Sequence, residues 1–244
     1  RPLILVGGPR MIYEPWKAFS EDPDNPWGAD AAVTGEEYVL LNLLESVLSI
    51  RARNESLRSA FQRARRRGAL DDVPGLVYGR AISPDGPIDE LVDTGIQRLV
   101  KDLDELPHAV LGYQLLEPPG NGPTLELQAL PGHRVRKHCI ISSLVLTAGC
   151  KFHCPYCPIP AYNQRQFRAK SGERVADEMQ RIAGTYGICN FFGADDNFFN
   201  DTSRTLDIVQ TLARQIGTRK RPLCKIRWAT EATIHDTLRI REHL

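Results

Sequence analysis

The chain of 244 residues is 42% hydrophobic and 25% charged, a balance typical of soluble globular proteins, and it lacks the run of about 18 apolar residues that a membrane span needs. Its 31 basic and 30 acidic residues nearly cancel, which gives no electrostatic reason to expect a nucleic-acid partner. The sequence starts at Arg1 within an apolar run and stops at Leu244 within a helical pattern, so we expect it to be a piece of a longer protein.

Two short apolar runs near the amino terminus predict buried strands. The first covers residues 2–6 and leads into Gly7 and Gly8, and the second covers residues 29–33 and is followed by Gly35. Because glycine has no side chain, a ligand can approach the backbone at such turns, which line ligand crevices in parallel α/β sheets. A tight turn explains the glycine pair equally well when it is considered alone.

Helical patterns and a segment rich in proline and glycine come next. Apolar residues recur at helical spacing from Leu40 to Leu48, and a second helix is predicted over residues 55–67. Proline and glycine become frequent within residues 71–138, and we interpret this segment as a linker with little core of its own.

From residue 139 onwards, predicted strands and helices alternate. The elements are a strand at 139–146, a helix at 172–186, a strand at 188–192, a helix at 202–216, a strand at 224–230 and a helix from about residue 235. This alternation indicates βαβ units and a parallel sheet, so the predicted fold class is α/β.

Three cysteines, Cys150, Cys154 and Cys157, lie within eight residues on the loop that leaves the strand at 139–146. Prolines in the loop prevent a regular helix, so we expect the three thiols to converge on one point. Thiolates are soft ligands that select an iron–sulfur cluster or zinc. A structural zinc site would need a fourth ligand such as His153. A zinc site and plain buried thiols both stay open as alternatives at this point.

The pattern Cys-x-x-x-Cys-x-aromatic-Cys, with Tyr156 at the aromatic position, resembles the cluster loop of the radical S-adenosylmethionine (SAM) superfamily. The resemblance implies that Cys150, Cys154 and Cys157 hold a [4Fe–4S] cluster and that SAM chelates its open iron. It also implies reductive cleavage of SAM to methionine and a 5′-deoxyadenosyl radical, which abstracts a hydrogen atom from the substrate. The implied fold of residues 139–244 is the first βα units of a partial TIM-type barrel.

Residues after the next two strands are candidates for SAM binding, because functional groups in such barrels follow the carboxyl ends of strands. Gly193, Asp195 and Asp196 stand where the family has a Gly-Gly-Glu element, although alanine replaces the second glycine and aspartate the glutamate. The resemblance implies that Gly193 lets SAM approach and that Asp195 or Asp196 accepts hydrogen bonds from its ammonium group. Helix capping by Asp196 or Asn197 is the alternative. Glu231, after the third strand, is a further candidate contact.

The order of strand, glycine pair, strand and "TGEE" helix in residues 1–70 resembles the second half of a flavodoxin/Rossmann-like cobalamin-binding domain, which precedes many radical SAM cores. The phrases "VPGLVY" and "DLDELP" within residues 71–138 are similar to the linker of cobalamin-dependent members. The resemblance implies cobalamin contacts at Gly7, Gly8 and Gly35. No Asp-x-His-x-x-Gly motif for a lower-face ligand occurs in the sequence.

Together, the resemblances imply a cobalamin-dependent radical SAM enzyme that methylates an unactivated carbon of a small molecule and takes electrons from a donor such as flavodoxin or ferredoxin. A cobalamin-dependent cyclase is one alternative. A radical methylthiotransferase is another, disfavoured because no cysteine precedes Cys139, and a zinc-stabilised binding module is the non-enzymatic one. Cys139, Cys189 and Cys224 are expected to be free thiols, and this cysteine usage favours a reducing cytoplasm. The sequence singles out no catalytic residue.

Overall fold

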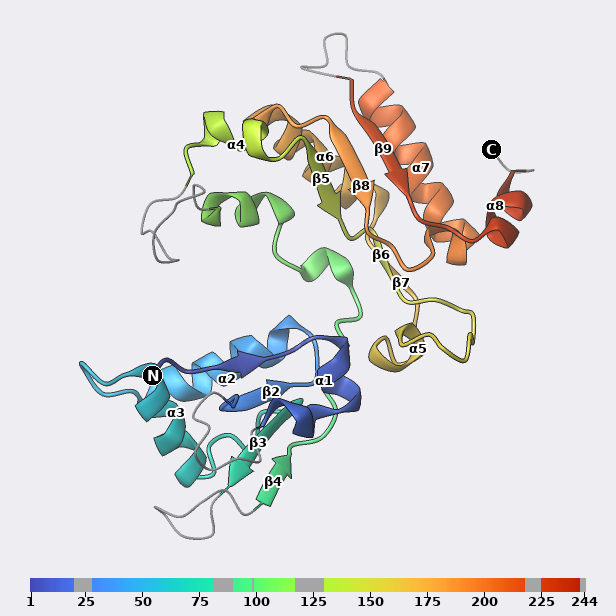
Figure 1. Cartoon of the computed structure of the whole chain (residues 1–244). Coiled ribbons are helices and arrows are strands. Elements are labelled where there is room, and N and C mark those ends of the chain that lie inside the picture. The colour runs from blue at the N-terminus through green and yellow to red at the C-terminus, as the bar shows by residue number, and fades with distance from the viewer. Residues whose placement is uncertain (20–27, 81–89, 98, 117–129, 218–224, 242–244) are drawn as a thin grey trace. The chain divides into compact units, whose positions relative to one another are not determined.

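The computed structural model describes residues 1–19, 28–80, 90–97, 99–116, 130–217 and 225–241. The chain folds into two compact units, Arg1–Val100 and Lys101–Leu244, whose elements are labelled in Figure 1. No helix within the described ranges combines the length and the apolar character that crossing a membrane requires.

The first unit is built on a four-stranded sheet. Its strands lie in the order β1 (Leu5–Val6), β2 (Ala31–Val33), β3 (Leu76–Arg80) and β4 (Glu90–Asp93). The two predicted strands, β1 and β2, pair in parallel, whereas β3 and β4 are antiparallel to their neighbours. The glycine turns after β1 and β2 therefore lie at the same edge of this sheet.

In the described part of the first unit, α-helices and a 3₁₀ turn accompany the sheet: α1 (Pro9–Tyr13), the 3₁₀ turn (Pro15–Ala18), α2 (Glu37–Ile50) and α3 (Leu57–Arg66). The Ser56 hydroxyl caps α3 by accepting the Ser59 N–H at 3.1 Å. Phe61 is fully buried and anchors α3 in the core.

The buried face of α2 differs from the predicted leucine stripe. Val39, Leu43 and Val47, at a spacing of four residues, are completely buried, whereas Leu41 and Leu48 are about half exposed. The helix is apolar on more than one face, so its periodicity alone did not identify the face that packs on the sheet.

The segment predicted to be a linker, residues 71–138, divides between the two units. Leu76 and Tyr78 of β3 are completely buried in the core of the first unit. Leu130 and Val135 belong to the core of the second unit. Turn-forming residues dominate the composition here and conceal the short strands, because a strand of four or five residues leaves a weak pattern.

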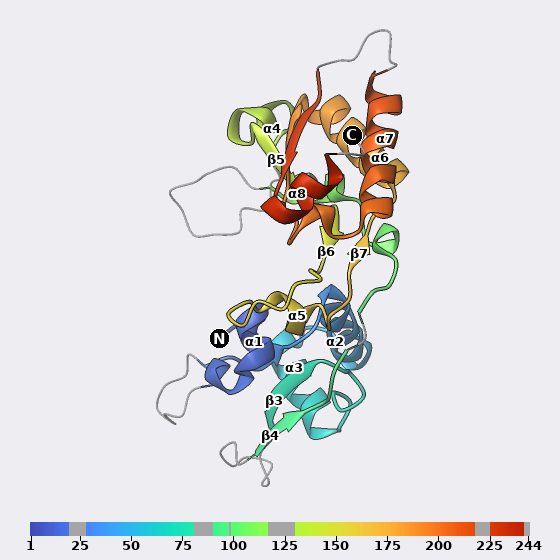
Figure 2. The same ribbon diagram turned by 90° about the vertical axis from the view of Figure 1, so that its right-hand side faces the viewer.

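The second unit contains a parallel sheet in the order β5 (Ile141–Leu144), β8 (Asn190–Gly193) and β9 (Arg227–Thr230). In its register, Leu144 pairs with Gly193 and Gly193 with Thr230. Helices α6 (Gly172–Tyr186) and α7 (Thr202–Gly217) lie side by side in both ribbon views and pack on one face of the sheet (Figure 2). These βα units confirm the predicted α/β fold class.

Helix α6 has the bounds that the sequence predicts, because its signals are local. The Ser171 hydroxyl accepts the Arg174 N–H at 3.1 Å, and Gly187, with φ of +70°, ends the helix. The remaining elements of the unit are 3₁₀ turns at Leu103–Glu105, Ala109–Leu115 and Phe198–Asn200, helices α4 (Gly132–His138), α5 (Ile159–Tyr162) and α8 (Ile234–Ile240), and the strand pair β6 (Thr147–Ala148) and β7 (Arg168–Ala169).

Candidate functional site

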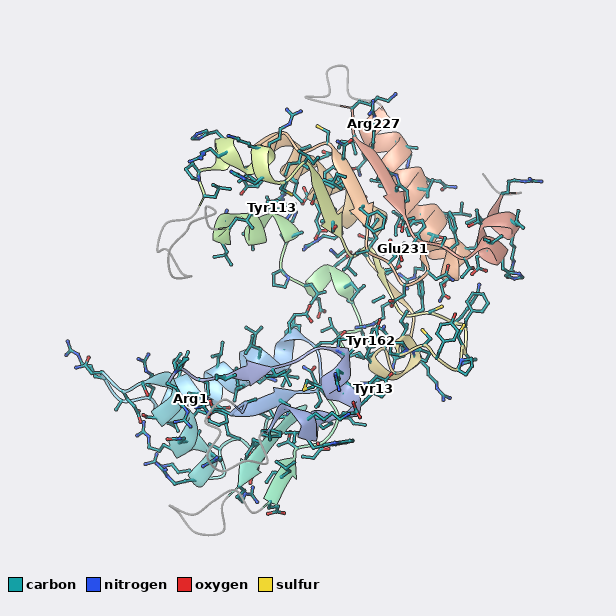
Figure 3. The ribbon with its side chains drawn as sticks, in the orientation of Figure 1. Arg1, Tyr13, Tyr113, Tyr162, Arg227 and Glu231 are labelled. Atoms are coloured by element: carbon teal, nitrogen blue, oxygen red, sulfur yellow. The ribbon has the colours of Figure 1, made fainter. Side chains whose placement is uncertain are left out.

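The carboxyl ends of β5, β8 and β9 meet at one edge of the parallel sheet. β5 leads through β6 to the three cysteines, β8 leads to Asp195 and Asp196, and β9 leads to Glu231. Figure 3 shows Glu231 at this end of β9 and Arg227 at the opposite end. The topology therefore gathers the loop and the acidic candidates at the edge where parallel α/β folds bind ligands.

The cysteine loop begins at a position that only glycine can occupy. Gly149 has a φ of +95°, and a Cβ there would lie 2.0 Å from the Gln166 carbonyl oxygen. Beyond it, Cys150 and Cys157 are partly buried and Cys154 is exposed, and all three are free thiols. The Cys157 N–H donates to the Cys154 carbonyl at 3.0 Å and closes one turn within the loop.

The chain by itself does not bring the three thiols together. Among the residues that the structure describes, no three His, Cys, Asp or Glu side chains meet in a geometry that holds a metal ion. The donor set still fits an iron–sulfur cluster, because three free thiols share one accessible loop and thiolates are the ligands such clusters take. We expect a bound cluster to draw the thiols to their final positions.

Tyr156 lies next to the exposed thiol. Its side chain is open to solvent, with the residue 87% exposed, and negative charge on Cys154 raises its pKa above the ordinary value for tyrosine. The ring is thus available for a ligand at the cysteine loop, and its contact with SAM stays a prediction.

Asp195 is buried and fully engaged by the chain. One carboxylate oxygen accepts the N–H groups of Leu146 and Thr147 at 3.0 and 2.7 Å and the Thr147 hydroxyl at 3.1 Å. The other accepts the Thr230 hydroxyl. Burial raises the pKa of Asp195 and outweighs these hydrogen bonds, which act to lower it. Asp195 therefore ties the ends of β5, β8 and β9 together.

Gly193 makes room for this carboxylate. A Cβ at Gly193 would lie 2.4 Å from the Asp195 Oδ2 and 2.8 Å from the Thr230 hydroxyl. The Cβ position of Gly193 is thus occupied by side chains of the same chain, and contact between Gly193 and SAM stays a prediction.

Replacing Asp195 by alanine should destabilise the second unit. The N–H groups of Leu146 and Thr147 would lose their acceptor inside the fold, and we expect the free energy of unfolding to fall by about 3 kcal/mol. Urea denaturation followed by circular dichroism measures this loss. A change under about 1 kcal/mol would show that the carboxylate does not brace the sheet.

Asp196 contacts the two ends of the cysteine loop. Its Oδ2 accepts the Gly149 N–H at 2.7 Å and the Asn163 side-chain amide at 3.2 Å, and its Oδ1 accepts the Tyr162 hydroxyl at 3.1 Å. Tyr162 is labelled on α5 in Figure 3. The structure thus brings the predicted acidic turn and the predicted cluster loop into direct contact.

Lys151, which no sequence motif identifies, forms a second attachment of the loop. Its Nζ lies 2.6 Å from the Asp236 carboxylate, and its backbone N–H donates to the Asn200 side chain at 2.7 Å. Burial opposes ionisation of Asp236, but hydrogen bonds from Lys151 and Asn197 outweigh it and lower its pKa. Asp236 therefore remains ionised and holds the lysine between the first two cysteines.

Glu231 differs from the two aspartates because its carboxylate has no hydrogen-bond partner among the described residues. The residue is exposed, and its backbone carbonyl accepts the Phe198 N–H at 2.9 Å. Within the described part of the chain, the Glu231 carboxylate makes no hydrogen bond or ion pair. It is the acidic candidate at this edge that can bind a cationic ligand without first losing a protein partner.

The glycines of the first unit divide into two kinds. Gly7 and Gly8 are exposed, a Cβ at Gly7 would meet atoms of Val33 only at an ordinary 3.6 Å, and nothing lies within 4 Å of a Cβ at Gly8. At Gly35, by contrast, a Cβ would lie 2.6 Å from the Gln97 side chain. The turn after β1 is open to a ligand, whereas the turn after β2 is filled by packing within the unit.

Two further cysteines, Cys139 and Cys189, belong to the described residues outside the loop. Cys139 precedes β5 and is a free thiol, as predicted. Cys189 is disulfide-bonded, so its expected free thiol is wrong, and Cys224 lies outside the described residues.

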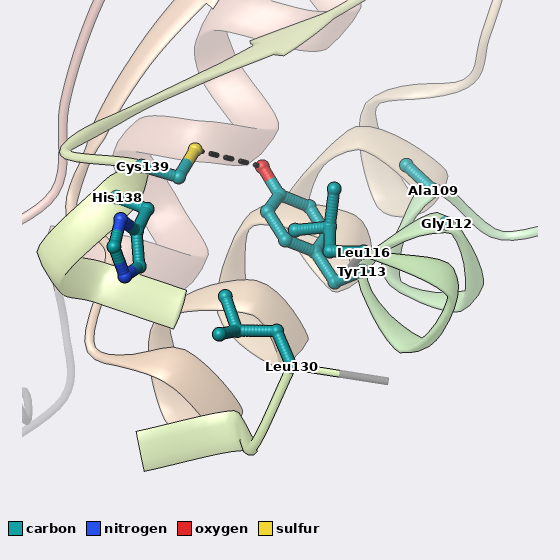
Figure 4. Close-up of a pocket in the computed structure, with 7 residues that line it drawn as sticks. All are labelled: Ala109, Gly112, Tyr113, Leu116, Leu130, His138 and Cys139. Carbon is teal, nitrogen blue, oxygen red and sulfur yellow. Dashed lines mark hydrogen bonds between the residues drawn. The ribbon is translucent and has the colours of Figure 1, made fainter. Parts of the chain in front are cut away.

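Cys139 lines an apolar cavity of about 470 Å³ near the amino end of β5, where its thiol lies 3.7 Å from the Tyr113 hydroxyl (Figure 4). Burial raises the pKa of Tyr113 to about 12. The cavity therefore lies toward the opposite end of β5 from the cysteine loop.

Comparison with known sequences finds methyltransferases. The chain is 24% identical over 219 residues to cytidylyl-2-hydroxyethylphosphonate methyltransferase of Streptomyces wedmorensis, which covers 88% of the chain and 38% of that enzyme. It is 30% identical over 98 residues to hopanoid C-2 methylase of Rhodopseudomonas palustris, which covers 39% of the chain and 18% of that enzyme. No protein-family model matches the chain.

Comparison with solved structures finds the same class of protein. The radical SAM methyltransferase TsrM of Kitasatospora setae, solved with cobalamin and a [4Fe–4S] cluster, matches 92% of the chain and 36% of its own with a TM-score of 0.57 and 14% identity. OxsB, a cobalamin-dependent SAM radical enzyme, matches 93% of the chain and 25% of its own with a TM-score of 0.58 and 19% identity. The chain has the fold of these cobalamin-dependent radical SAM enzymes.

The resemblance to cobalamin-dependent radical SAM proteins that the sequence predicts is therefore confirmed, as is the fold class. The chain spans 38% of the length of the Streptomyces methyltransferase that it matches. Within this fold, Asp195 joins the ends of the parallel strands, Asp196 holds the cysteine loop to the end of β8, and Lys151 holds it to α8.

Proposed function

We propose that the full-length protein is a cobalamin-dependent radical SAM enzyme that methylates an unactivated carbon of a small molecule. The observation that carries this proposal is the loop of three free cysteines at the carboxyl edge of a parallel sheet, in a chain that shares its fold with TsrM and OxsB. Two of its sequence relatives are named as a methyltransferase and a methylase, which favours methyl transfer over other radical reactions.

In this proposal Cys150, Cys154 and Cys157 hold a [4Fe–4S] cluster. When bound, the cluster supplies the single electron for reductive cleavage of SAM. The role of the chain is to present three thiols on a loop whose ends are fixed and to leave one iron open to SAM. A flavodoxin or ferredoxin is the class of protein proposed to deliver the electron. A reducing cytoplasm would suit the three free thiols of the loop, whereas the disulfide at Cys189 would be unusual there.

Cobalamin, proposed as the methyl carrier, would bind at the open turn after β1. Gly7 and Gly8 leave space there that a side chain would fill, and the turn lies at the carboxyl edge of the parallel strand pair, where ligands of doubly wound folds bind. Gly35, in the turn after β2, would pack against Gln97 rather than touch the ligand.

SAM binding should depend on Glu231. Its free carboxylate is proposed to accept hydrogen bonds from the ammonium group of SAM, so Glu231→Ala should weaken SAM binding roughly 10- to 150-fold, as loss of one charge-assisted hydrogen bond does. Calorimetry on the anaerobic full-length protein measures the change. Glu173→Ala, which removes an exposed glutamate from the first turn of α6, is the matched control and should leave affinity unchanged. Equal affinities in both variants would remove Glu231 from the SAM site.

The direct test of the proposed function is SAM cleavage. Full-length protein, reconstituted anaerobically with iron and sulfide and reduced with dithionite, should convert SAM to methionine and 5′-deoxyadenosine, both detected by liquid chromatography. The variant with alanine at Cys150, Cys154 and Cys157 should form neither product. A wild-type protein that holds zinc in place of iron and leaves SAM intact would contradict the proposal and support a zinc-stabilised binding module.

A further inference from the structure

We propose that Asp196 is a positioning residue that clamps both ends of the cysteine loop and thereby sets how firmly the cluster is held. The inference rests on the proposed cluster at Cys150, Cys154 and Cys157. It assigns to Asp196 a role different from the SAM contact that the sequence resemblance implies.

The contacts of one carboxylate reach both sides of the cysteines. Before the first cysteine, the Gly149 N–H donates to Oδ2 at 2.7 Å. After the last cysteine, the Tyr162 hydroxyl donates to Oδ1 at 3.1 Å and the Asn163 amide to Oδ2 at 3.2 Å, both from the region of α5. All three cysteines therefore lie between two points that a single side chain holds together.

The Gly149 end of this clamp is rigid. Ala148 pairs with Arg168 in the β6–β7 ladder, and the Gly149 backbone packs so closely on Gln166 that a Cβ would lie 2.0 Å from its carbonyl oxygen. The Gly149 N–H is thus aimed at Asp196 by its surroundings. Asp196 then transfers this fixed position to Tyr162 and Asn163 at the other end of the loop.

The Asp196 carboxylate would affect a cluster in two ways, by holding the loop ends and by its negative charge. First, three thiols can bind one cluster only if the loop gives up conformational freedom, and the clamp removes part of that freedom in advance. Second, a carboxylate bonded to the residue before Cys150 places negative charge near the cluster, which disfavours the added electron. Asp196 should therefore slow iron loss and keep the reduction potential low.

The first experiment needs no cluster. Hydrogen–deuterium exchange of the full-length apoprotein, read by mass spectrometry in peptides that cover Gly149, should be about tenfold faster in Asp196→Ala than in wild type, because the amide loses its acceptor. Asp207→Ala is the matched control, since the Asp207 carboxylate likewise accepts a backbone N–H, from Gly172 at 2.9 Å. Equal exchange around Gly149 in Asp196→Ala and the control would overturn the clamp.

The second experiment measures the loaded protein. In Asp196→Ala, a chelator should remove iron about tenfold faster than from wild type or Asp207→Ala. Asp196→Asn keeps an oxygen for Gly149 and removes the charge, so it should retain iron like wild type while its reduction potential becomes less negative. A change in overall folding alone would not alter the rate of iron loss in one variant and only the reduction potential in the other.

A double variant tests whether the two ends communicate through Asp196. Tyr162→Phe alone should speed iron loss, because one contact of the clamp is removed. In the Asp196→Ala background the same change should add nothing, because the partner is already absent. Additive rates would overturn the clamp. If wild type binds no iron, the proposed function fails; if wild type binds iron and all variants match the control, only the clamp fails.

Discussion

Replacing Cys150, Cys154 and Cys157 by alanine should leave the full-length protein without cluster iron. Anaerobically reconstituted wild type should hold about four irons per chain with a broad visible absorbance, and the triple variant should hold none. The effect is complete because each thiolate is a direct ligand and the loop offers no substitute ligand that clusters prefer. Iron and sulfide analysis after desalting measures the result.

Cys139→Ala is the matched control for this loss. The Cys139 thiol is also free, but it lies at the amino end of β5, where it donates to the Ile141 carbonyl at 3.1 Å. This variant should keep the full iron content. Brown absorbance retained in the triple variant would refute the assignment, and loss of iron in Cys139→Ala would show that the ligand set is different.

The features that the sequence predicts correctly depend on residues close together in the chain. Helix α6 is predicted at its observed bounds because Ser171, the stripe of apolar residues and Gly187 lie within one segment. The position of the cysteine loop after a buried strand is also local information. The parallel pairing of β5, β8 and β9 follows from the alternation of strands with helices of ordinary length.

The features that the sequence conceals depend on distant partners. Gly35 and Gly193 are needed because the side chains of Gln97 and Thr230, far along the chain, occupy the space beside them, which no local pattern reveals. Asp196 meets Gly149 across 47 positions of sequence, and Lys151 meets Asp236 across 85. A family motif identifies such residues but not their partners within the fold, and a contact of Asp195 or Asp196 with SAM stays a prediction. Glu231 is distinguished from the two aspartates only by the structure, because its carboxylate has no partner among the described residues.

Full-length protein should bind cobalamin, and Gly8→Val in the turn after β1 should abolish this binding while the iron–sulfur cluster is retained. Gly7 and Gly8 belong to the first unit and the cysteines to the second, so the two losses should be separable. Titration with hydroxocobalamin under anaerobic conditions, followed by desalting and visible spectroscopy, measures the bound cofactor. Iron analysis of the same samples reports the cluster.

The choice of glycine decides what the experiment means. Gly8 has a φ of +97°, so Gly8→Val strains the backbone even where no ligand is present, and Gly68→Val, at a φ of +71° in the turn after α3, is the control for such strain. Gly7 shows no such φ, and a Cβ there would make only ordinary contacts with Val33. Gly7→Val should therefore leave the unfolding transition nearly unchanged and weaken cobalamin binding roughly ten- to hundredfold, because its side chain would enter the ligand's space.

Cobalamin bound equally well by wild type, Gly7→Val and Gly8→Val would place the cofactor elsewhere. A wild type that cleaves SAM but retains no cobalamin would remove methyl transfer by this route and leave a radical SAM enzyme without the second cofactor.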